Sequence, residues 1–438
     1  MRLFKNIRLG VILAITYIRA HWYFFLIGLA LALALFFLGP NLQSKQIETV
    51  GFVGDYTVSN LPLSIQKEIS FGLTTVQASG EVAPGVAKSW VITDSGRTVT
   101  FALNTSLRWQ NGESVSADSI NYNLKSVLLT RPAPDQIRLA LKEPFAPLLT
   151  VVSQPLFKNG LVGLGRWRVD GVNFNGRFVQ SLTLSDSQSG LRKLYKFYPD
   201  EKSVTVALKL GAINKAIDLH NAANFQTDSH YQVESRLATT TLATLFFNLE
   251  KNNFDDKSFR QGLIYALPDQ FSQGEAVDSP IPQGNWAKTV QAKKYPQNFD
   301  LAKKLLSSSA SKSAQIKITI QTIPELEDVA KQIVTAWQKA GITTTIQVTD
   351  VPDPTFDTYL AFMELPTDPD QYLLWHSTQP TNISHYKSPK VDKLLEEGRR
   401  TLDEKERKSI YADFQRALTE DAPAAFLFYP KLYTITRK

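Results

Sequence analysis

A run of uncharged and largely apolar residues near the N-terminus constrains this chain more than any other feature. The run is seventeen residues long, from Trp22 to Leu38, and Gly39 and Pro40 follow it. This is about the shortest stretch that crosses a bilayer as a helix. A cluster of basic residues, Arg2, Lys5, Arg8 and Arg19, lies on its N-terminal side. Because positive charge favours the cytoplasmic side, residues 1–40 are expected to form a cytoplasmic lead and a single transmembrane anchor, with the body outside.

Two other interpretations of this run stay open. A cleaved signal peptide also has a basic start and an apolar stretch, but Gly39, Pro40 and Asn41 do not form a small-residue cleavage site. A buried core helix normally keeps a polar face, which an uninterrupted apolar run lacks. We therefore favour the anchor.

The rest of the chain has the composition of an ordinary globular protein. Its 438 residues, 43% of them hydrophobic, suit two sizeable lobes better than one core. The net charge of +7 falls to +3 when the four basic residues of the lead are subtracted (7 − 4 = 3), which leaves no electrostatic footprint for nucleic acid. The chain has no cysteine, so disulfides, thiolate metal sites and a lipid-modified N-terminal cysteine are excluded.

Hydrophobic patterns of strand and helix alternate along the body, which favours an α/β fold. Strands are expected at Thr98–Leu103, Ser181–Leu184, Val204–Leu208, Leu242–Leu249, Ile316–Thr322, Thr343–Val348 and Ala424–Thr436. Helices are expected at Ser116–Leu128, Asp255–Leu267, Asp300–Leu306, Glu325–Ala340, Asp392–Leu402 and Glu404–Glu420.

No local motif for catalysis or metal binding occurs in the sequence. The five histidines are scattered without the i, i+4 spacing of a zinc helix, and nucleophile elbows, phosphate loops and dinucleotide fingerprints are missing. Asp368 and Asp370 are the nearest approach to a paired-carboxylate site, but carboxylates beside proline are commoner in turns. We expect no enzyme activity, no cofactor and no metal, and hydrolysis at this pair is the weakest alternative.

Several phrases of the chain, taken together and in order, resemble those of one family. They are Glu81–Leu103 (EVAPGVAKSWVITDSGRTVTFAL), Leu107–Val127 (LRWQNGESVSADSINYNLKSV), Phe246–Leu267 (FFNLEKNNFDDKSFRQGLIYAL) and Ile383–Leu418. They resemble the extracellular solute-binding proteins of family 5, which are the peptide, nickel and oligosaccharide binding proteins of ABC importers. The resemblance covers most of the body and depends on the phrases occurring together.

The resemblance implies a type II periplasmic-binding-protein-like fold, with two α/β lobes and a cleft between them. Lobe 1 is expected at residues 41–238, with a reduced extra subdomain at about 139–230. Lobe 2 is expected at 239–423, and residues 424–438 are expected to form a strand that returns to lobe 1. The protein would act as a monomer that delivers peptides or similar solutes to an ABC transporter permease.

The same resemblance points to ligand-binding residues. In peptide-binding members, an aspartate before an Asp-Pro pair holds the amino group of the ligand, and here the phrase MELPTDPDQY offers Glu364 instead. Trp375 lies nearby in a segment too polar for a simple core strand. The candidates are Glu364, Asp368, Asp370, Tyr372, Trp375 and His376. The alternative function is a membrane-tethered scaffold or chaperone-like module that kept the fold and lost transport.

Overall fold

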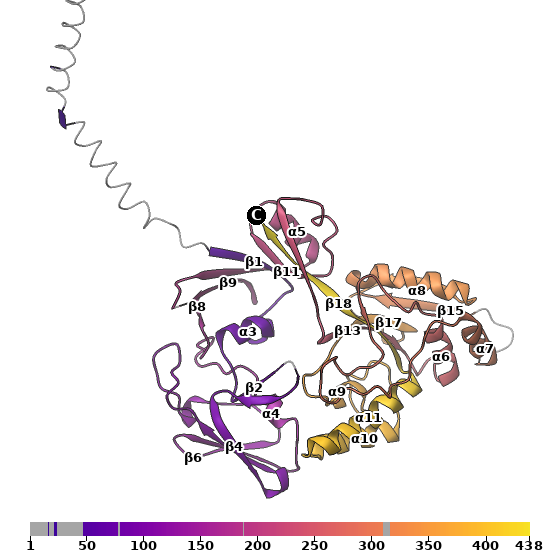
Figure 1. Ribbon diagram of the computed structural model, residues 1–438, viewed down its shortest axis with the longest axis horizontal. Coiled ribbons are helices and arrows are strands. Elements are labelled where there is room, and N and C mark those ends of the chain that lie inside the picture. The colour runs from indigo at the N-terminus through magenta and orange to yellow at the C-terminus, as the bar shows by residue number, and fades with distance from the viewer. Residues whose placement is uncertain (1–15, 17–21, 24–46, 78, 187, 310–315) are drawn as a thin grey trace, which may run out of the picture.

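The protein consists of two α/β halves that share one long strand (Figure 1). The computed structural model describes residues 16, 22–23, 47–77, 79–186, 188–309 and 316–438. We call residues 47–237 the N-terminal half and residues 241–423 the C-terminal half. The shared strand, β18 (Ala424–Arg437), follows the C-terminal half and runs back to the N-terminal half.

The N-terminal half is rich in strands. They are β1 (Ile47–Val53), β2 (Thr74–Val76), β3 (Val82–Pro84), β4 (Ala87–Thr93), β5 (Thr98–Leu103), β6 (Val127–Ala133), β7 (Gln136–Leu141), β8 (Trp167–Asn175), β9 (Phe178–Asp186), β10 (Arg192–Tyr198), β11 (Lys215–Leu219) and β12 (Tyr231–Leu237). Its helices are α3 (Leu63–Ile69), α4 (Leu148–Val151) and α5 (Glu201–Lys209), with 3₁₀ turns η2 (Val58–Asn60), η3 (Asp94–Gly96) and η4 (Ala117–Ser119).

The C-terminal half has longer helices. They are α6 (Lys257–Tyr265), α7 (Phe299–Ser309), α8 (Glu327–Lys339), α9 (Tyr372–Trp375), α10 (Pro389–Arg400) and α11 (Glu404–Asp421), with a 3₁₀ turn η5 (Pro324–Leu326). Its strands are β13 (Thr241–Phe247), β14 (Gly274–Ala276), β15 (Lys317–Thr322), β16 (Thr343–Val348) and β17 (Thr358–Glu364).

Strand β18 joins the two halves into one sheet. The order along the sheet is β16-β15-β17-β13-β18-β11-β1-β10-β9-β8, with β12 and β14 also paired to β18. The first part of β18 pairs with β13, whereas its last residues pair with β11. Fourteen extended residues reach roughly 45 Å at 3.3 Å per residue, which is long enough to pair with strands of both halves. A separate four-stranded sheet, β4-β5-β7-β6, completes the N-terminal half.

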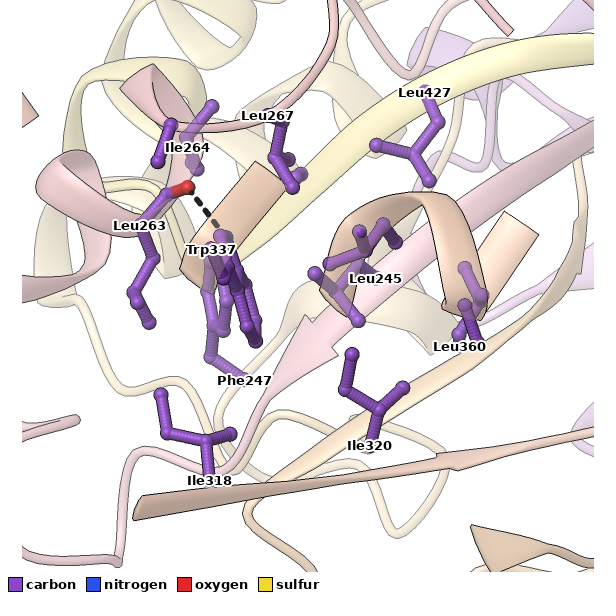
Figure 2. Packing of buried hydrophobic residues seen from close by; sticks show 14 of the residues in the cluster. Leu245, Phe247, Leu263, Ile264, Leu267, Ile318, Ile320, Trp337, Leu360 and Leu427 are labelled. Carbon is purple, nitrogen blue, oxygen red and sulfur yellow. Dashed lines mark hydrogen bonds between the residues drawn. The ribbon is translucent and has the colours of Figure 1, made fainter. Parts of the chain in front are cut away.

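The core of the C-terminal half lies between its sheet and helices α6 and α8. Trp337 of α8 is fully buried, and its indole Nε1–H donates to the carbonyl oxygen of Leu263 in α6 at 3.0 Å (Figure 2). Leu245 of β13 and Ile320 of β15 belong to the same cluster of apolar side chains. Burial of apolar area of this kind makes the main favourable contribution to the free energy of folding of each half.

Most of the strands and helices predicted from hydrophobic periodicity are confirmed. The strands at Thr98–Leu103 and Thr343–Val348 have the predicted bounds, and the other confirmed elements differ by a few residues at their ends. The strand predicted at Val204–Leu208 is wrong, because these residues lie in helix α5. The side chain of Asp200 caps this helix by accepting from the backbone N–H of Ser203, which favours a helix start here.

The helix predicted at Ser116–Leu128 is also wrong. Only Ala117–Ser119 forms a 3₁₀ turn, and strand β6 begins at Val127. The chain between them is held by tertiary contacts. The hydroxyl of Tyr122 donates to the carbonyl of Val152 at 2.7 Å and accepts from the backbone N–H of Leu73 at 3.1 Å. These contacts outweigh the helical spacing of the apolar residues.

The predicted anchor, Trp22–Leu38, lies outside the described residues except for its first two. Of the parts of the chain that the structure describes, no helix has both the length and the apolar character needed to cross a membrane.

Candidate functional site

The segment from Phe362 to Tyr372 runs along the N-terminal half and contacts it. The segment begins at the end of β17, passes through a turn with two prolines, and ends at the start of α9. Phe362 and Thr367 make the contacts near its start and its middle. Beside its end, Arg399 covers Tyr372 and contacts Phe145 of the N-terminal half. We call this contact region the seam.

The first contact is a pair of stacked rings beside the shared strand. His220, which follows β11, stacks on Phe362 of β17 with centroids 4.7 Å apart and 16° between the ring planes. The imidazole is held in place by Glu201, whose Oε1 lies 2.8 Å from Nδ1 and also accepts from the backbone N–H of His220. Among the described residues, Nε2 of this histidine has no hydrogen-bond partner.

The middle contact depends on a glycine. Gly80 has φ +88°, and a Cβ placed on it would lie 3.1 Å from Nδ2 of Asn285 and 3.2 Å from Cδ1 of Trp286. The same Nδ2 donates to the carbonyl oxygen of Thr367 at 2.9 Å. Both the positive φ and the close approach require glycine here. The turn at Gly80 therefore packs closely against the C-terminal half.

Glu364 lies on the seam between the first two contacts, at the end of β17. It pairs across the sheet with Thr241, whose Oγ1 donates to Oε1 of the carboxylate at 3.1 Å. The residue is exposed, yet desolvation by the surrounding protein raises the pKa of its carboxyl above the usual value. Of the six predicted site residues, Glu364 is the most exposed to solvent.

Asp368 is anchored in the interior. Its two carboxylate oxygens accept from Arg407 of α11 at 2.7 and 3.2 Å, and the two side chains are only 10% and 7% exposed. Burial is the largest single influence and would lower the pKa of the Arg407 guanidinium, but the charge and hydrogen bonds of Asp368, together with Tyr411, outweigh burial and raise it. A bidentate pair of this kind fixes the turn to α11 and leaves the carboxylate little freedom to bind anything else.

Asp370, Tyr372 and His376 form a packed group at the end of the seam. Nε of Arg399 donates to Oδ2 of Asp370 at 2.8 Å, although burial still raises the pKa of that carboxyl. Tyr372 stacks on His376 with centroids 4.1 Å apart. His376 is buried, and its Nε2 lies 3.3 Å from Oε1 of Glu396. Tyr372 is half-buried, and the guanidinium carbon of Arg399 lies 4.1 Å from its ring centroid.

Trp375 lies behind the seam, in the interior. It is 1% exposed, packs with Phe246 and Phe426, and donates from Nε1 to Oε1 of Gln371 at 3.0 Å. The structure therefore leaves Glu364 exposed at the seam, places Asp370 and Tyr372 beside Arg399, and buries Asp368, Trp375 and His376. Ligand contact by any of the six residues stays a prediction.

Sequence reasoning missed the partners from the N-terminal half. His220 and Gly80 lie far from the Glu364 segment in the chain, and neither belongs to a motif. The positive φ of Gly80 could have been suspected from its place in a short turn, but its partner could not. A cavity of about 470 Å³ also lies within the C-terminal half, lined in part by Phe271, Asp278 and Lys294.

The fold and the seam define the class of the protein. Two α/β halves that share a strand and meet along a polar seam have the architecture of type II periplasmic binding proteins. Two solved structures align with this chain over 90% of its length and 94% of theirs. They are NikZ from Campylobacter jejuni in complex with Ni(L-His), with TM-score 0.76 and 20% identity, and AppA from Bacillus subtilis in complex with a nonapeptide, with TM-score 0.71 and 19% identity.

The sequence comparisons add the family. Residues 193–384 match the model of bacterial extracellular solute-binding proteins, family 5 Middle. The oligopeptide-binding protein AppA of Bacillus subtilis is 26% identical over 54% of this chain, which spans 50% of that protein's length. The probable D,D-dipeptide-binding periplasmic protein DdpA of Escherichia coli is 21% identical over 83% of this chain and 82% of its own. Residues 193–384 are thus similar to the family 5 extracellular solute-binding proteins, the family that the sequence phrases resemble.

Proposed function

We propose that this protein is an extracytoplasmic solute-binding protein that captures peptides or similar extended solutes for an ABC importer. The observation that carries the proposal is the seam, where exposed Glu364 of one half lies near the His220 and Phe362 contact between the halves. The matched relatives are named as binding proteins for oligopeptides, nickel or D,D-dipeptides, and these names support a solute of this kind. The protein would act as a monomer together with a membrane permease.

Capture would occur between two lobes. The proposed lobes are residues 41–238 and 239–423, and residues 424–438 return to the first lobe. The pairing of β18 with both β13 and β11 supports this division. A solute that touches both lobes only when they meet shifts the population toward the closed arrangement.

The N-terminal run from Trp22 to Leu38 is proposed to anchor this binding protein to the cytoplasmic membrane. Its uncharged character and the basic residues before it support an N-terminus inside and a body outside. Removal of residues 1–40 should then release the body from the membrane fraction of intact cells. A truncated chain that still sediments with membranes would argue against the anchor.

The first experiment is mass spectrometry of small molecules that co-purify with the full-length protein. Bound peptides would support the proposal, and metal chelates or sugars would redirect it to another solute class. A preparation that carries no solute and binds none from a peptide mixture would oppose capture and favour the scaffold function.

Glu364 is proposed to hold the amino group of a peptide ligand. The Glu364→Gln variant keeps the size of the side chain and removes its charge, so peptide affinity should fall by about tenfold or more, as expected when a charge-assisted hydrogen bond is lost. Isothermal titration calorimetry with the co-purified peptide measures the change. Glu325→Gln, at an exposed glutamate elsewhere in the C-terminal half, should leave the affinity unchanged.

The same role gives a pH dependence with a definite sign. The raised pKa of Glu364 means that its carboxyl takes up a proton at a higher pH than an ordinary glutamate does. Since only the ionised form attracts an ammonium group, affinity should be full above this pKa and should weaken as the pH falls through it. A pH profile that is the same for the wild-type protein and the Glu364→Gln variant would contradict the role.

A further inference from the structure

The far end of the seam carries contacts that the solute site does not use. They join the N-terminal half near β7 and α4 to the end of α10, on the opposite side of the molecule from β11 (Figure 1). Their centre is Arg399. Its guanidinium carbon lies 4.1 Å from the ring centroid of Tyr372 in its own half and 5.2 Å from that of Phe145 in the N-terminal half. Both distances are within the range of cation–π attraction.

The charge of Arg399 is already satisfied within the C-terminal half. Asp370 accepts from its Nε at 2.8 Å, and Tyr372 covers the guanidinium. Separation of the halves would therefore leave no buried charge without a partner. Of the contacts that Arg399 itself makes, separation removes the ring of Phe145 and one backbone bond, from the N–H of Ala146 to the carbonyl of Arg399 at 2.7 Å. Because opening this contact leaves no charge unpaired, the two halves can separate and meet again at a small cost in free energy.

The neighbouring contacts are weaker. Arg400 and Glu143 form an ion pair at 2.9 Å, but their side chains are 54% and 63% exposed, so water and salt screen the attraction. Leu402 packs against Gly96. The ring of Phe145 on the guanidinium of Arg399 is thus a less exposed side-chain contact across the seam than the ion pair beside it.

We propose that Phe145 and Arg399 form a latch that holds the two halves together and so sets how tightly a solute between them is retained. They are positioning residues, because they act through the arrangement of the halves. When only a fraction of molecules has the halves together, the apparent dissociation constant rises in inverse proportion to that fraction. The part of the inference that concerns solute retention rests on the proposed function, whereas the latch itself does not.

The test measures the distance between the halves in full-length protein without added solute. Spin labels on Leu128→Cys and Val290→Cys, whose parent side chains are 64% and 91% exposed, report this distance by pulsed electron paramagnetic resonance. The chain has no cysteine of its own to react with the label. The Phe145→Leu variant keeps an apolar side chain against the core of the N-terminal half and removes the aromatic face.

The ratio of short to long distances should fall about twofold to fivefold in Phe145→Leu, as expected when a partly exposed cation–π contact is lost. The ratio should also fall in Arg399→Lys, because lysine keeps the charge but lacks the planar guanidinium. Phe174→Leu, at a phenylalanine of β8 that is 53% exposed, is the matched control and should keep the wild-type ratio.

An unchanged ratio in Phe145→Leu, or a wild-type protein with no short-distance population, would overturn the latch. Either result is independent of the proposed function, whose failure would appear as the absence of any bound solute. Where a solute binds, its affinity should fall in Phe145→Leu by the same factor as the fraction of molecules at the short distance. A solute affinity that stays constant while this fraction falls would overturn the link to retention.

Discussion

Replacement of Asp368 by alanine is expected to lower the free energy of unfolding by about 3–5 kcal/mol. The loss of stability is expected because the partner of Asp368, Arg407, would remain in the interior. Arg407 is 7% exposed, and without the carboxylate of Asp368 its charge would be buried without a counter-ion. Its remaining acceptors, such as the carbonyl of Gly398 at 2.9 Å, are neutral. Urea denaturation followed by circular dichroism measures the loss.

Two further variants test whether the unpaired charge of Arg407 causes the loss of stability. Asp328→Ala removes a carboxylate that is 74% exposed and pairs with Lys331 on the surface, so its cost should stay below about 1 kcal/mol. The double variant Asp368→Ala/Arg407→Leu should recover much of the stability lost in Asp368→Ala, because it removes the unpaired charge. An Asp368→Ala protein with full stability and lost solute affinity would instead make Asp368 a ligand-binding residue.

Local pattern was sufficient for elements whose apolar side chains recur with the period of a strand or of a helix. The strand at Thr343–Val348 and the helix at Glu404–Asp421 are of this kind, and their sequences identified them almost to the residue. The stretch from Ser116 to Leu128 differs, because the hydroxyl of Tyr122 finds its partners at Leu73 and Val152. Such long-range partners are invisible to periodicity.

The candidate site likewise contains residues that the sequence pointed to and residues that it did not. Resemblance to known sequences pointed to the segment that begins at Glu364, and the structure shows that this segment faces the other half. Which of its side chains point outward depends on the short helix α9, which turns Trp375 and His376 inward. The opposing residues, His220 and Phe145, come from parts of the chain whose proximity depends on the shared strand. No local pattern encodes that proximity.

Trp375→Ala is expected to lower the free energy of unfolding by about 3–5 kcal/mol, the usual cost of deleting a large buried side chain. Trp375 is 1% exposed and packs with Phe246 of β13 and Phe426 of β18, so its loss leaves a cavity where α9 meets the sheet. The carboxamide oxygen of Gln371, itself buried, would also lose its donor. Urea denaturation again gives the free energy.

The matched control for this variant is Leu373→Ala, because Leu373 lies in the same helix and is 58% exposed. Its effect should stay within about 0.5 kcal/mol. Trp375→Phe keeps most of the volume and should cost about 1–3 kcal/mol, since it leaves Gln371 without its indole donor. If Trp375 were instead a wall of the solute site, Trp375→Ala would retain its stability and lose solute affinity. That outcome would place the solute on the α9 side of the sheet and would require Phe246 and Phe426 to be accessible to it.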